Sequence, residues 1–121
     1  MILKLSHKNL DTWKKSLDLV ELINVLTKKL PTDEKYIIIP QLKRAAISVA
    51  SNIVEGYARS SKLETRRFLD ISIASLVEID TQLEICIRLN YVNEDGLVKL
   101  DVLINHLFAM LTKLKKSIRI N

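Results

Sequence analysis

The sequence predicts an all-α protein that folds as an antiparallel, up-down-up-down four-helix bundle. Its 121 residues fit one domain, and 48% of them are hydrophobic, which is enough to build a core. Only 2 Gly and 2 Pro occur, whereas a sheet protein needs more of these residues for its turns. Apolar residues recur at spacings of three and four, which is the helical period. We expect residues 1–8 to be a flexible lead-in and residues 9–121 to be the bundle domain.

The first helix is expected to begin at Asn9 or Asp11, either of which can cap free N–H groups, and to end before Pro31. Lys28 and Lys29 are expected in its last turn, where positive charge is favourable against the helix dipole. The expected apolar face consists of Leu10, Trp13, Leu17, Val20 and Ile23.

The second helix is expected to be capped by Thr32 or Asp33 and to finish by about Arg59. Pro40 disturbs this pattern, because a proline inside a helix removes one hydrogen bond and clashes with the preceding turn. Either the helix begins near Pro40 or it is distorted there, and we expect a kink or a distorted first turn. The apolar positions include Ile38, Leu42, Ala45, Val49, Ile53 and Tyr57.

Ser61 and Glu64 have the spacing of a capping box, which predicts the start of a third helix that runs to about Leu89. Asn93 and Gly96 mark the next turn. A fourth helix follows, with apolar residues at Leu97, Leu100, Ile104, Leu107, Leu111, Leu114 and Ile118. Because short links make sequential helices antiparallel, the four helices are expected to form an up-down-up-down bundle.

Composition excludes several classes of protein. The single cysteine, Cys86, cannot form an internal disulfide, and its apolar neighbours predict a buried thiol. The start of the chain is too charged for a signal peptide, and no apolar run approaches the length of a membrane span. We therefore expect a cytoplasmic protein with no membrane role. The net charge of +5 permits binding to nucleic acid or to an acidic partner.

Basic residues gather in two stretches of the sequence. They surround the link between the second and third helices and close the fourth helix, at Arg59, Lys62, Arg66, Arg67, Lys113, Lys115, Lys116 and Arg119. In an up-down-up-down bundle these stretches lie at the same end, where they would contact the phosphates of RNA or DNA. The alternative is an ordinary solvated surface. Tyr57 is the nearest aromatic residue, so a platform for stacking bases is not evident.

Polar residues form two further stripes at helical spacing. Their members are Gln41, Arg44, Ser48, Asn52 and Glu55 in the second helix, and Ser75, Glu78 and Gln82 in the third. In one interpretation the stripes meet as a polar network, within one chain or at a subunit contact, with Arg44 paired to Glu78 or Glu55. In another they face a ligand or partner, with Arg44, Asn52 and Glu55 as binding residues. A catalytic role is the third.

Catalysis and metal binding have little support in the sequence. The two histidines, His7 and His106, have no other metal-binding residue types gathered near them, so no metal site is predicted. No nucleophile–base pair is recognisable, and we predict no catalytic residues, no cofactor and no enzymatic activity.

The segment from Gln41 to Gly56 closely resembles the core signature of the bacterial four-helix bundle family, also known as the 23S rRNA intervening-sequence protein family. The resemblance covers roughly residues 8–115, and Pro40 departs from the family pattern. Further matching residues are Leu10, Trp13, Leu30, Pro31, Glu34, Arg59, Phe68, Leu69, Ile71, Ala74, Ser75, Leu76, Glu78, Gln82, Leu89, Asn90 and Tyr91.

The resemblance implies a four-helix bundle encoded within rRNA intervening sequences or elsewhere in bacterial genomes. A related branch is the accessory protein of diversity-generating retroelements, a homopentamer that binds a reverse transcriptase and nucleic acid. The chain is more similar to the intervening-sequence branch. The third helix carries apolar residues on more than one face, which also predicts an oligomer. The leading hypothesis is thus a non-enzymatic, self-assembling, pentameric protein that contacts RNA or DNA. The alternative is an adaptor that recruits another protein.

Overall fold

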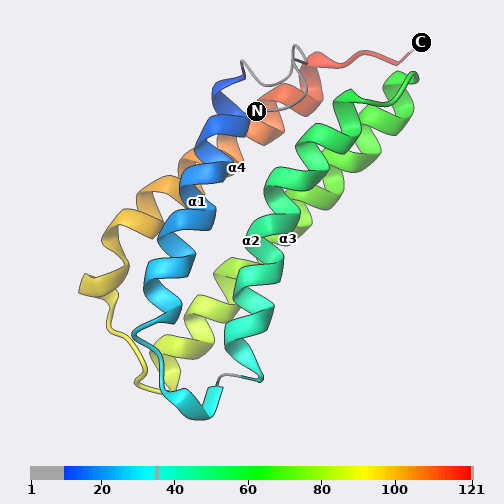
Figure 1. The fold of residues 1–121 in the computed structure, drawn as a ribbon. Coiled ribbons are helices and arrows are strands. Elements are labelled where there is room, and N and C mark those ends of the chain that lie inside the picture. The colour runs from blue at the N-terminus through cyan, green and yellow to red at the C-terminus, as the bar shows by residue number, and fades with distance from the viewer. Residues whose placement is uncertain (1–9, 35, 121) are drawn as a thin grey trace.

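In the computed structural model, which describes residues 10–34 and 36–120, the chain is helical. Its long helices are α1 (Asp11–Thr27), α2 (Ile38–Tyr57), α3 (Lys62–Arg88) and α4 (Val98–Ser117). Each helix runs antiparallel to the next, and α4 closes the bundle against α1 (Figure 1). The predicted all-α four-helix bundle is confirmed. The predicted lead-in, residues 1–8, lies outside the described residues.

The buried face of α1 differs from the expected one. Leu17 is 38% exposed, and the buried face passes through Ser16 and Leu19 instead. Ser16 tolerates full burial because its hydroxyl donates to the Trp13 carbonyl one turn earlier. Helical spacing alone does not distinguish Ser16 from Leu17, since both lie within one turn of Trp13.

The helix α1 begins at Asp11 and ends before Pro31, as predicted, but the expected cap at Asp11 and the expected lysines in the last turn were wrong. The N-cap position is Leu10, which makes no side-chain capping bond, and Asp11 is the first helical residue. Asn9 lies outside the described residues. Lys28 is the C-cap and Lys29 lies beyond it, so neither belongs to the last turn. The helix ends earlier than Pro31 alone requires, and Leu30 is buried in the link that follows.

Pro40 is the third residue of α2, so the expected kink or distorted first turn was wrong and the alternative, a helix that begins near Pro40, is correct. The N–H groups of the first helical turn have no acceptor within the helix, so a proline in that turn removes no helical hydrogen bond. Thr32 and Asp33 do not cap α2; they lie in a separate 3₁₀ turn, η2 (Thr32–Glu34).

The start of α3 agrees with the prediction. The Ser61 hydroxyl accepts a hydrogen bond from the Glu64 backbone N–H at 3.0 Å. Beyond α3, the Asn93 side chain accepts from the Gly96 N–H at 2.9 Å and opens a second 3₁₀ turn, η3 (Glu94–Leu97). The Tyr91 hydroxyl donates to Glu34 Oε1 at 2.6 Å, which ties the link after α3 to η2 at this end of the bundle.

Aliphatic side chains from all four helices fill the core, and Cys86 is fully buried among them. The contact between α2 and α3 is the most extensive. Buried hydroxyls cross it: Ser72 donates to the Val49 carbonyl at 2.7 Å, and Thr65 donates to the Gly56 carbonyl at 2.8 Å. No helix in the described part of the chain is long and apolar enough to span a membrane.

Candidate functional site

The α2–α3 link and the end of α4 meet at one end of the bundle, where the green and red segments approach each other in Figure 1. A shallow depression of about 450 Å³ lies between them. Arg59, Lys62 and Arg119 line it, so it joins cations from both of the basic stretches in the sequence. Tyr57 contributes to its wall, and burial raises the pKa of the Tyr57 hydroxyl. We call this end, with the eight candidate cations, the basic end.

Arg59 is held in place by three contacts. Its guanidinium bonds the Glu55 carboxylate at 3.2 Å, approaches Glu64 at 3.9 Å and lies 4.9 Å from the centre of the Phe68 ring. Each exposed ion pair contributes little to stability, but together with the ring contact they orient the side chain. Because two carboxylates lie close to its guanidinium, Arg59 is less available to bind a phosphate than its position in the sequence suggests.

Lys115 is also paired, with the Asp70 carboxylate of α3 at 2.6 Å. The remaining candidate cations, Lys62, Arg66, Arg67, Lys113, Lys116 and Arg119, form no ion pair with a described residue. All are exposed except Arg66, which is partly buried and whose Nε has no hydrogen-bond partner in the described chain. The structural roles of Phe68 and Asp70 were missed by sequence reasoning, although Asp70 is the nearest acid on α3 that follows the cations.

The polar stripes of α2 and α3 face each other along part of their length. The Ser48 and Ser75 hydroxyls are 2.7 Å apart, and the Asn52 amide donates to the Ser48 hydroxyl at 2.9 Å and to its carbonyl at 2.8 Å. The Gln82 amide donates to Glu78 at 3.2 Å and to Gln41 at 3.4 Å. These bonds form a polar seam between the two helices.

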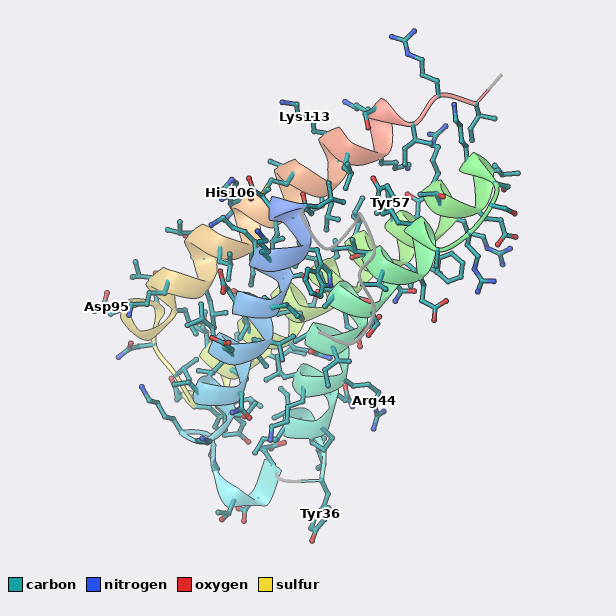
Figure 2. All side chains as sticks on the ribbon, turned by 45° about the horizontal axis from the view of Figure 1, so that its top comes forward. Tyr36, Arg44, Tyr57, Asp95, His106 and Lys113 are labelled. Carbon is teal, nitrogen blue, oxygen red and sulfur yellow. The ribbon has the colours of Figure 1, made fainter. Side chains whose placement is uncertain are left out.

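Two charged members of the stripes, Arg44 and Glu55, take no part in this seam. Arg44 points away from the bundle (Figure 2) and pairs with neither Glu78 nor Glu55 nor any other residue of the described ranges. Glu55 is engaged by Arg59 instead.

Exposed isoleucines flank the polar seam on α3. Ile71 is 41% exposed and Ile85 is 43% exposed. They share one stripe with the buried Ser75 and Gln82, because the spacings along this stripe are three and four residues. The surface over the seam is therefore a mixed face, in which Ile71 and Ile85 lie on either side of the exposed carboxylate of Glu78.

The structure also bears on metal binding. Among residues 10–34 and 36–120, no group of three or more His, Cys, Asp or Glu side chains is arranged to hold a metal ion. His106 is exposed on α4, and His7 lies outside the described residues.

Comparison with known proteins places this fold in context. The model of a family described as 23S rRNA-intervening sequence protein matches residues 8–113. A solved structure from Bacteroides thetaiotaomicron, a protein of unknown function from the S23 ribosomal protein family, is 24% identical with a TM-score of 0.79. That similarity covers 87% of this chain and 98% of the other, and it shows the fold alone. No curated protein matches the chain.

Proposed function

This chain belongs to the 23S rRNA-intervening sequence protein family, and from that premise we propose that it is a non-enzymatic, self-assembling binding protein of the bacterial cytoplasm. Its basic end would contact the phosphate backbone of RNA or DNA. The observation that supports this proposal most directly is the shared depression, in which Arg59 and Lys62 meet Arg119 from the other end of the chain.

Electrostatics favour the unpaired cations as the phosphate contacts. Lys62 and Arg119 are exposed and unpaired within the described chain, whereas Arg59 and Lys115 already have carboxylate partners. Free cations release counterions from a phosphate backbone, and such binding is tolerant of sequence and steeply dependent on salt. Each phosphate contact contributes about 0.9 to the logarithmic salt slope for a duplex and about 0.7 for a single strand.

The test is the binding of nuclease-treated protein to labelled RNA and duplex DNA over a salt series. We expect the double variant Lys62→Gln/Arg119→Gln to bind more weakly and to lower the salt slope by roughly 1.4 for a single strand and roughly 1.8 for a duplex. Its matched control is Lys28→Gln/Lys29→Gln, which removes the same charge at the opposite end of the bundle. Equal losses in both double variants would reject the basic end. No binding by the unmodified protein at low salt would favour a protein-only adaptor.

Self-assembly is proposed through the mixed face over the polar seam. A ring of five subunits, which the family resemblance implies, would repeat the basic end around a rim. Ile71→Glu places a charge on this face, and we expect it to shift sedimentation toward smaller species while the helical content stays unchanged. Val25→Glu on α1, at 51% exposure, is the control. Unchanged sedimentation of the Ile71→Glu protein would exclude this face as the contact.

A further inference from the structure

A second groove lies on the bundle away from the basic end, between α3 and α4. It has a volume of about 670 Å³ and extends along α4 from Val98 to Phe108, which corresponds to roughly 15 Å of helix. Asp95, which belongs to η3, lies just before the start of α4, and Lys113 lies toward the far end of that helix (Figure 2). We call it the α3–α4 groove.

The floor of the α3–α4 groove is apolar. Leu76, Leu83 and Ile104 form its buried base. At its edges Val77 is 51% exposed and Phe108 is 45% exposed, so large apolar side chains face solvent in a concave surface. An exposed apolar surface of this kind favours contact with an apolar partner surface.

The rim of the groove carries only one sign of charge. Among the described residues, the charged ones that line it are Asp80, Glu84, Glu94, Asp95 and Asp101, with no Lys, Arg or His. None of these carboxylates belongs to an ion pair with a described residue. They are also spread along the rim, since none of them belongs to a described group arranged to hold a metal ion. A series of separated negative charges is complementary to cations spaced along a polymer, not to a single ion.

We propose that the α3–α4 groove binds a cationic amphipathic helix of a partner protein, with apolar side chains on the floor and Lys or Arg against the rim. A helix is the conformation expected of the occupant, because the groove offers no sheet edge and a bound backbone must satisfy its own hydrogen bonds. A helix of about ten residues matches its length. This inference does not depend on the basic end.

A second copy of this chain fits the groove less well. The cations that end α4 lie on a helix whose apolar residues, Leu111 and Leu114, already face the chain's own core. Such a segment has no apolar face left for the floor of the groove.

The net charge of +5 also repels a cationic peptide overall, so binding of such a peptide requires the local negative field of the rim.

The test uses a fluorescent Leu/Lys amphipathic peptide of about fourteen residues and the full chain, measured by fluorescence anisotropy. We expect Asp80→Lys/Glu84→Lys to weaken binding by about tenfold or more, since two attractive contacts become repulsive. Phe108→Ala, at an exposed position, should weaken binding by several-fold without affecting the fold. The matched control Asp18→Lys/Glu21→Lys, on the exposed surface of α1, should leave affinity within about twofold.

Three results would overturn the proposal. One is an equal loss of peptide binding in the α1 control variant. Another is binding of a scrambled Leu/Lys peptide as tight as that of the amphipathic one, which would indicate charge attraction without the apolar floor. The third is a change in sedimentation of the peptide-free Asp80→Lys/Glu84→Lys protein, which would assign the groove to a contact between copies of this chain.

Discussion

Gly56 lies at a close approach between α2 and the first turns of α3, and replacing it with alanine tests how tightly the two helices are held. A Cβ at this position would lie 3.1 Å from the Thr65 carbonyl oxygen and 3.1 Å from the Phe68 Cβ. Neither atom is the end of a flexible side chain. The added methyl group can therefore fit only if the first turns of α3 move away from α2.

Two opposing contributions determine the magnitude. Alanine is favoured over glycine in a helix by up to about 1 kcal/mol, and by less here because Gly56 is close to the end of α2. Overpacking costs about 1–3 kcal/mol. Moving α3 also weakens the hydrogen bond from Thr65 to the Gly56 carbonyl, a contribution of about 1 kcal/mol. We expect Gly56→Ala to lower the free energy of unfolding by about 1–2 kcal/mol.

Urea unfolding followed by circular dichroism measures this difference, with all proteins at one concentration because an oligomer's stability depends on it. The control is Ser51→Ala, an exposed position in the same helix, which should be neutral or slightly stabilising. A Gly56→Ala protein as stable as Ser51→Ala would show that the α2–α3 contact is loose, and the reasoning from close approach would be wrong.

Three further predictions concern buried and tethered groups. Gln82 Oε1 is buried without a hydrogen-bond partner. Gln82→Met should therefore leave the free energy of unfolding in urea unchanged or raise it by up to about 1–2 kcal/mol. A fall in the free energy of unfolding by more than about 1–2 kcal/mol would contradict this reasoning. The hydrogen bond to Glu34, and then desolvation, raise the pKa of Tyr91 above its ordinary value of 10.0. Its contribution to stability is therefore complete below about pH 10 and lost as pH rises through the folded-state pKa, so unfolding curves of Tyr91→Phe should show a smaller alkaline loss than the unmodified protein. Burial, and then Glu34, raise the pKa of the Cys86 thiol, which should react with a disulfide reagent only as fast as the bundle opens; rapid reaction in the absence of urea would show that α3 is accessible there.

Local sequence signals predicted a helix boundary correctly where a single local interaction determines it. Ser61 caps α3 as predicted, because a serine hydroxyl satisfies a free N–H without help from the rest of the fold. Pro40 was misjudged, since its effect depends on whether it falls in the first turn, and the chain's own pattern does not give that boundary. Ile38, the first residue of α2, is buried in the core, which is a property of the tertiary structure.

The candidate sites, too, were only partly predictable from the sequence. The sequence places the cations at one end of an antiparallel bundle, but only the structure shows that Glu55, Glu64 and Asp70 pair with some of them. Helical spacing predicts the polar stripes, and it does not reveal that Arg44 stays outside the seam.

The sequence by itself determined the fold class, the number of helices and their antiparallel order, because periodicity and short links depend on neighbours along the chain. The tertiary structure alone decided which cations remain unpaired and that carboxylates of α3, η3 and α4 share one apolar groove. Contacts between different helices depend on the rotation of each helix about its axis. That rotation is set by the packing of whole faces, as the burial of Ser16 in place of Leu17 illustrates.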